Sequence, residues 1–365
     1  MQRRYFLQTV WMGSVALGLR GGLFAEEAKP SCQWINLEKL PLEGRAWENE
    51  ERATPYVRFP KRWMDKMPGG VRGNAQHSSG IVAHFTTNSS QILLRCSVVD
   101  KSLAMNHMPA TGKSGFDLYC KDDAGTFRFV TNTVPREGDI PFPGRMGEKK
   151  EREYMLYFPL YNQASHVEIG LDSDATFAVV PVEKKPMLFY GTSIVHGACA
   201  SRPGMPHPAI LGRRLGRPFW NFGFSGSGKM EPVLAEAFAE LDPCIYILDC
   251  LPNMNPPLVT ERAAEFVRIL RKARPETPIL LVEDRVAPVS WIHAGRADFH
   301  KKNHAALKAQ YELLLAEGVK KLGYLGGDGL LPPDGDGTVD NSHPTDWGFL
   351  YHANVMQPKI EELLQ

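Results

Sequence analysis

The chain has 365 residues, of which 43% are hydrophobic and 23% are charged, and its formal net charge is +1. This composition is ordinary for a soluble globular protein, and the length favours two domains over one. The near-neutral charge, without a basic stripe, argues against a nucleic-acid partner, and the spacing of the six cysteines does not match a zinc site.

The N-terminus has the pattern of an export signal. Arg3 and Arg4 precede an apolar stretch over residues 6–19, and the small residue Ala25 follows before two acidic residues. This arrangement is typical of a cleaved secretory signal, and the paired arginines resemble a twin-arginine signal. The stretch is shorter than the roughly 20 residues of a membrane span. We therefore expect a signal over residues 1–25, a periplasmic or secreted bacterial protein and no stable membrane insertion after cleavage, with an uncleaved anchor as the alternative.

All six cysteines lie beyond this signal. An oxidising compartment permits disulfide bonds, but the sequence does not determine which cysteines pair. If Cys244 and Cys250 share one strand, they lie about 20 Å apart at ~3.3 Å per residue and cannot bond to each other. We expect most of the cysteines to be buried thiols.

Residues 31–182 have the pattern of a β domain. Short apolar runs are separated by turn signals such as Asn88-Ser89-Ser90, and no helix of convincing period stands out. Strands are predicted over residues 80–87, 91–98, 116–120, 126–130, 155–160, 166–171 and 177–180. Many short strands joined by turns indicate a β-sandwich, or jelly-roll-like, domain.

From residue 185 the pattern changes to strands that alternate with helices. Strands are predicted over residues 187–190, 219–222, 244–248, 279–282 and 322–325. Helices are predicted over residues 208–215, 230–241, 258–273, 300–317 and 347–364. Such alternation predicts an α/β domain over residues 185–365, with a mostly parallel sheet between two helical layers. Catalytic loops then belong at the carboxyl ends of the strands.

A serine and a histidine have the positions that nucleophilic catalysis requires. Ser193 follows the first of these strands, and a serine is a weak nucleophile that needs a base. His343 is the best base, because Asp340 lies three residues before it and can orient the imidazole. His196 and His207 are rival bases that we expect to line a pocket or lie on the surface. Taken separately, each signal has a plainer explanation. Ser193 could cap a helix, and Asp340 and His343 could belong to a surface turn.

Other residues could stabilise the negative charge of a tetrahedral intermediate. Gly226 offers a backbone N–H with no side chain in the way, and Asn253 offers a side-chain amide. The N–H of Ser193 is a third donor. Asn221 and Gly223 are expected to shape the turn before Gly226. The alternative for Asn253 is a loop or helix cap.

In combination, these pieces resemble the SGNH (GDSL-type) hydrolase family, whose four sequence blocks supply Ser, Gly, Asn and His in this order. By position, the resemblance assigns these roles to Ser193, Gly226, Asn253 and His343, with Asp340 completing the triad. Two blocks depart from the family pattern. The first commonly carries Gly-Asp-Ser and reads Gly191-Thr192-Ser193, and the third commonly carries Gly-x-Asn-Asp and reads Leu251-Pro252-Asn253-Met254.

A second resemblance covers the N-terminal half. The run Gly115-Phe116-Asp117-Leu118-Tyr119 is similar to the signature of the GxDLY domain, which precedes SGNH catalytic domains in exported bacterial proteins. Together the two resemblances imply a β-sandwich joined to a three-layer α/β/α esterase domain. Related proteins with a β domain before an SGNH domain include carbohydrate deacetylases.

The resemblance implies an exported serine esterase that needs no cofactor or metal. Its expected substrate is a short acyl ester, preferably acetyl, on a carbohydrate, either a small molecule or a polysaccharide. His196, Arg202 and Trp347 are candidate substrate contacts, although Arg202 could instead form a salt bridge at a helix start. Trp220, Trp291 and Trp347 are expected in the core or at the rim of the site rather than as a platform for a sugar. Asp334, Asp336 and Asp340 do not have the spacing of a helix-loop-helix calcium loop.

Two other functions fit the sequence, and each has a test. A lipid esterase or thioesterase would use the same chemistry and prefer long acyl chains. A carbohydrate-binding protein with a vestigial site would bind without turnover. The sequence leaves the oligomeric state open. Because ligand sites favour domain junctions, we expect the N-terminal domain to contribute one wall of the substrate cleft.

Overall fold

The computed structural model of the protein describes residues 32–365, which form one compact unit. The predicted export signal at residues 1–25 lies outside the described residues. Within the described range, none of the helices is both long and apolar enough to cross a membrane. All six cysteines fall in this range and are free thiols, and three of them are buried.

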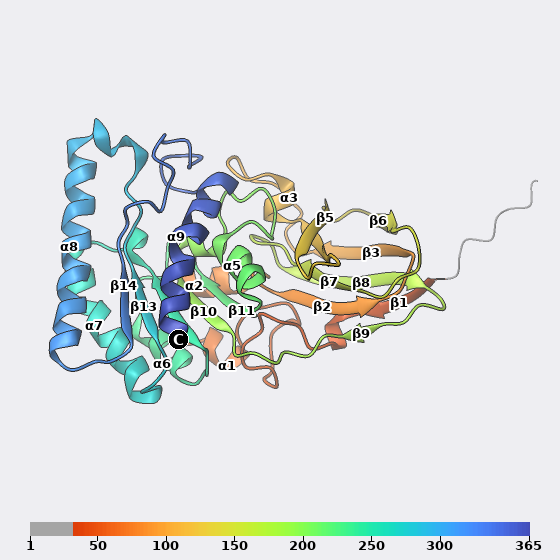
Figure 1. The fold of residues 1–365 in the computed structure, drawn as a ribbon, viewed down its shortest axis with the longest axis horizontal. Helices are drawn as coiled ribbons and strands as arrows, with labels where there is room; N and C mark the ends of the chain where they lie inside the picture. Colours follow the sequence, from red (N-terminus) through yellow and green to blue (C-terminus); the bar gives the residue numbers. More distant parts are fainter. Residues whose placement is uncertain (1–31) are drawn as a thin grey trace, which may run out of the picture. The chain divides into compact units, whose positions relative to one another are not determined.

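Two antiparallel sheets enclose the core of the N-terminal domain (Figure 1). The four-stranded sheet has the order β1-β8-β3-β6, with β1 (Cys32–Asn36), β3 (Gln91–Val98), β6 (Ile140–Arg145) and β8 (Ala164–Asp172). The five-stranded sheet has the order β5-β4-β7-β2-β9, with β2 (Val82–Thr87), β4 (Phe116–Lys121), β5 (Phe127–Thr133), β7 (Arg152–Tyr157) and β9 (Ala178–Val179). Burial alternates along β3, as expected for a strand with one face in the core. The predicted sandwich is confirmed.

The sequence did not reveal every element of this half. Strand β6 contains Pro141 and Pro143 and lies at the edge of its sheet, where proline is tolerated but weakens the strand pattern. The structure also contains a 3-10 turn and three short helices, which are η1 (Leu37–Lys39), α1 (Lys61–Met64), α2 (Gly69–Ala75) and α3 (Ala110–Lys113). The helices have only four to seven residues, too few to produce a visible helical period.

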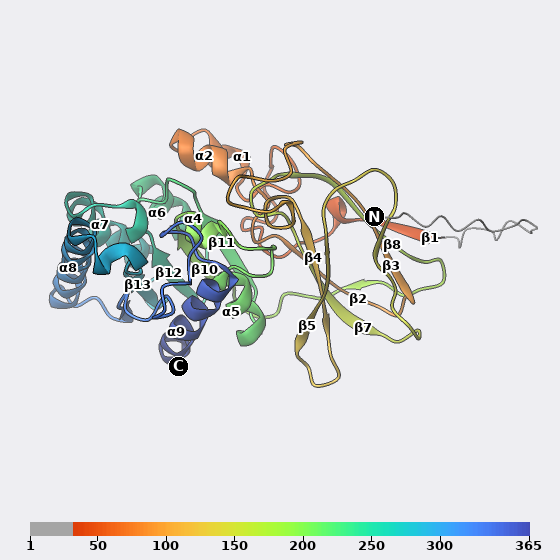
Figure 2. The same cartoon turned by 90° about the horizontal axis from the view of Figure 1, so that it is seen from above.

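The second half is built on a five-stranded parallel sheet, as predicted. Its order is β11-β10-β12-β13-β14, with β10 (Met187–Gly191), β11 (Phe219–Gly223), β12 (Ile245–Asp249), β13 (Ile279–Val282) and β14 (Leu322–Leu325). The helical segments are α4 (Ser193–His196), α5 (His207–Leu215), α6 (Pro232–Ala239), η2 (Leu251–Asn253), α7 (Pro256–Ala273), η3 (Pro288–Trp291), α8 (Ala294–Ala316) and α9 (Asp346–Leu364). Helices α6, α7 and α8 cover one face, and α4, α5 and α9 cover the other (Figure 2).

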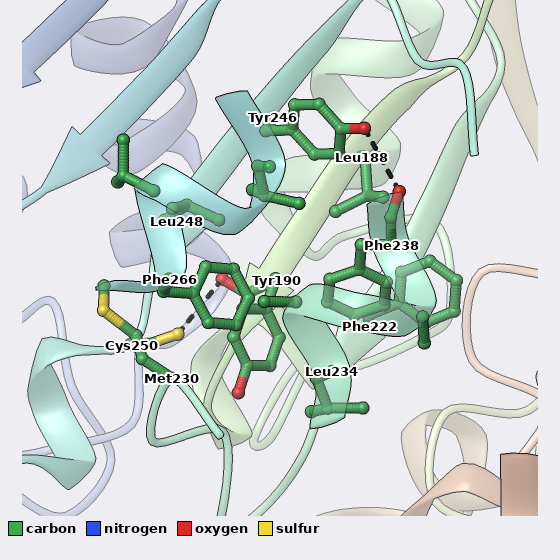
Figure 3. Packing of buried hydrophobic residues seen from close by; sticks show 14 of the residues in the cluster. Leu188, Tyr190, Phe222, Met230, Leu234, Phe238, Tyr246, Leu248, Cys250 and Phe266 are labelled. Atoms are coloured by element: carbon green, nitrogen blue, oxygen red, sulfur yellow. Dashed lines mark hydrogen bonds between the residues drawn. The ribbon is translucent and has the colours of Figure 1, made fainter. Parts of the chain in front are cut away.

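Strand β10 shows why these strands read as unbroken apolar runs. Leu188 and Tyr190 point into the cluster beneath α6 and α7, where the Tyr190 ring stacks on Phe266 (Figure 3). Met187 and Phe189 point to the opposite face. A strand covered on both faces needs apolar residues at every position.

One N-terminal segment packs against the α/β half instead of the sandwich. Residues 46–75 contribute Phe59, Trp63 and Val71 to the hydrophobic cluster that also contains Phe222 of β11. The rings of Phe59 and Phe222 lie 4.8 Å apart. In both views α1 and α2 lie beside the α/β half (Figures 1 and 2). The domain boundaries at residues 182 and 185 remain a prediction, and this packing joins the two halves.

This packing predicts a large effect of a change at Phe59. Phe59→Ala leaves a cavity in the core under the parallel sheet, and we expect it to lower the free energy of unfolding by about 3–5 kcal/mol. Urea unfolding of residues 32–365, followed by circular dichroism, measures this change. Leu313→Ala on the exposed side of α8 is the control, expected within about 0.5 kcal/mol of wild type. If both changes altered the free energy of unfolding by the same amount, packing of Phe59 against the α/β half would not contribute to stability.

Candidate active site

The serine begins a short helix at the carboxyl end of β10. Ser193 is the first residue of α4, and the Thr192 side chain caps this helix by accepting a hydrogen bond from the Ile194 N–H. Thr192 stands where the resemblance leads one to expect an aspartate. The cap shows that threonine can support the turn in its place. The exposed fraction of Ser193 is 7%, so only its tip reaches solvent.

The structure brings Ser193, His343 and Asp340 into one hydrogen-bonded chain. The Oγ of Ser193 lies 2.9 Å from Nε2 of His343, and Nδ1 of His343 lies 2.7 Å from Oδ2 of Asp340. The backbone N–H of His343 also donates to Oδ1 of Asp340. This is the geometry in which a histidine can take the proton of a serine hydroxyl while a carboxylate fixes its tautomer.

Hydrogen bonding keeps the Asp340 carboxylate charged. Partial burial acts to raise its pKa, but the backbone N–H and imidazole of His343 outweigh burial and hold the pKa below the ordinary value. An ionised carboxylate at this position stabilises the imidazolium that forms when His343 accepts a proton.

Arg285 anchors the loop that carries this pair. It follows β13 and is buried, and its guanidinium donates to the carbonyl and the hydroxyl of Ser342 at 2.9 and 2.6 Å. Arg285 was not predicted from the sequence. The signal was present, because three charged residues, 283–285, directly follow an apolar strand at the carboxyl edge of the sheet.

The predicted oxyanion donors lie on two adjoining turns. Gly226 has φ +66°, a conformation that suits glycine, and a Cβ added there would meet no atom within 4 Å. The amide of Asn253, at the end of η2, donates to the Ser227 carbonyl. An asparagine amide has two N–H groups, so one remains for a ligand.

Asn221 and Gly223 shape the turn before Gly226, as expected. The Asn221 amide donates to the Val195 carbonyl at 2.7 Å, and its oxygen accepts from the Gly223 N–H at 2.9 Å. A Cβ on Gly223 would lie 2.0 Å from the backbone nitrogen of His196, so only glycine lets α4 approach this closely.

The two rival histidine bases are buried away from solvent. His196 is fully buried, its ring stacks on Tyr161, and its Nε2 lies 2.7 Å from the Leu160 carbonyl. His207 is fully buried as well, and burial holds the pKa of both histidines well below the ordinary value. His196 has no surface for a ligand, so we no longer expect it to contact a substrate.

Arg202 makes a salt bridge with the N-terminal domain. Its guanidinium lies 2.9 Å from Asp117 and also donates to the Tyr119 hydroxyl, and these are the Asp and Tyr of the GxDLY run. Asp117 additionally accepts from the Gly204 N–H at 2.8 Å. The motif therefore binds the loop after α4. The third candidate contact, Trp347, is 48% exposed at the start of α9.

Two further side chains, those of His107 and Cys199, lie close to His343 without taking part in the hydrogen bonds that join Ser193, His343 and Asp340. The ring of His107, from the loop between β3 and α3, has its centroid 6.0 Å from that of His343, so a residue of the N-terminal domain lies beside the predicted base. Cys199, Asp340 and His343 offer ligand atoms within 4.8 Å of one another. This group does not suit a metal, because Asp340 and His343 bond to each other and burial raises the pKa of the Cys199 thiol to about 12.

Comparisons with known proteins agree with this geometry. Residues 184–361 match the GDSL-like lipase/acylhydrolase family, and residues 32–177 match the GxDLY family, described as the N-terminus of SGNH-hydrolase-type esterases. A protein from Bacteroides ovatus ATCC 8483, described as a GDSL-like lipase, is 34% identical and has a TM-score of 0.85. The match covers 92% of this chain and 98% of that chain.

More distant structures share the fold. The salicylyl-acyltransferase SsfX3 from a tetracycline biosynthetic pathway is 19% identical, with a TM-score of 0.74 over 91% of this chain and 97% of that chain. A family two carbohydrate esterase from Cellvibrio japonicus is 12% identical, with a TM-score of 0.60 over 92% of this chain and 98% of that chain. No curated protein sequence matches the chain.

The hydrogen bonds that join Ser193, His343 and Asp340 predict the effect of removing the negative charge of Asp340. Asp340→Asn keeps the size of the side chain but cannot stabilise the imidazolium, and we expect kcat for a p-nitrophenyl ester to fall about a thousandfold to ten-thousandfold. Steady-state kinetics on folded protein measures this. Asp242→Asn, an exposed carboxylate paired with Lys185, is the control and keeps wild-type kcat. A fall of less than tenfold in Asp340→Asn would contradict the assignment.

Proposed function

We propose that this chain, which belongs to the GDSL-like lipase/acylhydrolase family of SGNH hydrolases, is an exported serine esterase that removes short acyl groups, acetyl above all, from carbohydrate. The observation that carries the proposal is the hydrogen-bonded chain from Ser193 through His343 to Asp340 at the carboxyl edge of the sheet. The shared fold of family two carbohydrate esterases supports a carbohydrate substrate. The predicted signal at residues 1–25 supports export.

The proposed reaction proceeds through an acyl-enzyme. Ser193 attacks the ester carbonyl while His343 takes its proton and Asp340 stabilises the imidazolium. The N–H groups of Ser193 and Gly226 and the amide of Asn253 bind the oxyanion of the tetrahedral intermediate. His343 then donates its proton to the leaving alcohol. Water, activated by His343, attacks the acyl-enzyme and releases the acid and the free serine.

A cleft next to the catalytic loop supports a carbohydrate over a lipid. It has a volume of about 690 Å³, within the usual range for ligand sites, and it shares Asn341 with the loop that carries His343. Its titratable lining residues are all carboxylates, which are Asp328, Asp334 and Asp336. These groups accept hydrogen bonds from hydroxyls and repel anions, so they suit a neutral polyol. Trp291 lines the cleft and is 85% exposed, so it offers an aromatic face to a sugar, a role that we did not expect from the sequence.

Acyl-chain preference is the direct test of the proposed function. Purified protein is compared on p-nitrophenyl acetate and octanoate, beside Ser193→Ala. We expect faster release of p-nitrophenol from the acetate, and no turnover above background in the variant. A preference for octanoate would support a lipid esterase. Binding of glycan without turnover of any ester would support a carbohydrate-binding protein with a vestigial site.

The cleft predicts a substrate-dependent effect of Trp291→Ala. On acetylated xylo-oligosaccharide we expect kcat/KM to fall about fivefold to tenfold, because the loss of an aromatic contact is worth about 1 kcal/mol. On p-nitrophenyl acetate, which carries no sugar to contact Trp291, we expect no change. Ile292→Ala, an exposed neighbour outside the cleft, is the control and retains activity on both substrates. If Trp291→Ala lowered kcat/KM equally on both substrates, the cleft would not be the site that binds the carbohydrate.

A further inference from the structure

A buried arginine of the N-terminal half binds the backbone beside the Gly226 turn. Arg58 has an exposed fraction of 0%, although it lies in the irregular segment between η1 and α1. Its Nη1 donates to the carbonyls of Asn221 and Gly223 at 2.8 and 2.9 Å. Its Nε and Nη2 donate to the carbonyls of His77 and Asn74. One guanidinium therefore joins the segment after α1 to the end of β11.

The charge of Arg58 has no carboxylate to balance it. Among residues 32–365, the structure contains no salt bridge that includes Arg58, and burial lowers the pKa of its guanidinium to about 9. A buried charge without a counter-ion is costly unless its N–H groups are satisfied. Here four backbone carbonyls accept from it. Two of these carbonyls, those of Asn221 and Gly223, belong to buried residues on the open edge of β11, and a hydrophobic side chain in place of Arg58 would leave them without this partner.

Two of the carbonyls that Arg58 binds, those of Asn221 and Gly223, lie at the end of β11, directly before the turn that carries the predicted oxyanion donor. Gly223 is three residues before Gly226, and the N–H of Phe224 between them donates to the Gly191 carbonyl at 3.0 Å. A second group from the same N-terminal segment acts on this turn, because the Asn74 amide donates to the Ser225 carbonyl at 3.1 Å. The turn is thus held from both ends, by β10 and by residues 58–77.

We propose that Arg58 is a positioning residue for the oxyanion-binding turn, supplied by the N-terminal half to the catalytic half. The inference rests on the proposed esterase function. An oxyanion donor is effective only when it lies about 2.7–3.1 Å from the oxygen of the transition state. A small displacement of the Asn221 and Gly223 carbonyls would turn the Gly226 N–H away from that point. Binding of the ground-state ester would change little, since the donor acts on charge that develops later.

The test compares Arg58→Lys and Arg58→Gln in the full chain. A lysine has a single nitrogen and cannot span four carbonyls, and a glutamine has two N–H groups and no charge. For both variants we expect kcat on p-nitrophenyl acetate to fall about a hundredfold, with KM within about twofold, as for the loss of one oxyanion donor. The affinity for phenylboronic acid, whose serine adduct imitates the tetrahedral intermediate, should fall by a similar factor.

A matched arginine controls for stability. Arg271 donates to the carbonyls of Arg274, Pro275 and Thr277 before β13, at the opposite end of the sheet. Arg271→Lys also removes bonds to backbone carbonyls, and we expect it to lower the melting temperature without changing kcat or the affinity for the boronic acid. If the Arg58 variants do not fold, Asn74→Ala tests the same turn, and it is expected to lower kcat with KM unchanged.

Each result decides between positioning and simple structural support. Folded Arg58 variants with wild-type kcat, or with kcat and boronic-acid affinity lowered no more than in Arg271→Lys, would overturn the inference. If the wild-type protein neither hydrolysed an ester nor bound the boronic acid, the proposed function itself would be wrong. Ester turnover that depends on Ser193 but is indifferent to Arg58 and Asn74 would leave the function standing and remove this inference alone.

Discussion

The register of the parallel sheet is the constraint on which the site depends. Strand β10 pairs with β11 on one side and β12 on the other, so that Gly191 lies level with Gly223 and with Asp249. The turns that follow these strands therefore start at the same height, at the point where the strand order reverses. One turn carries Ser193, the next leads to Gly226 and the third leads to η2. The base comes from the long loop after β14.

These turns need support from outside the sheet, and the N-terminal half provides it. Asp117 of the GxDLY run binds the loop after α4, and the Tyr161 hydroxyl donates to the carbonyl of Ser193 itself at 3.3 Å. The Ser79 hydroxyl binds the carbonyl at the end of α4, and Arg58 binds the end of β11. A domain with no residue in the series Ser193–His343–Asp340 thus contacts the turns on both sides of Ser193.

The sequence predicted the parts of the molecule that local patterns encode. Strand β13 has the predicted bounds, because a run of four apolar residues between polar turns is too short for a helix and suits a buried strand. Ser193, Asp340 and His343, which the structure joins by hydrogen bonds, could be selected as candidates because they adjoin such runs or each other. Strand β6 was missed because prolines at an edge hide its pattern. Arg58 was missed because its partners in β11 are more than 160 residues away, and no local signal marks such a contact.

The measurement that tests the account most directly is the site of covalent labelling by a fluorophosphonate. The reagent reacts with a serine only where a base activates the hydroxyl and donors hold the developing oxyanion. Mass spectrometry of the digested protein should place a single adduct on Ser193, and the adduct should be absent in Ser193→Ala. No adduct on the folded wild-type protein, or an adduct on a different serine, would contradict the account.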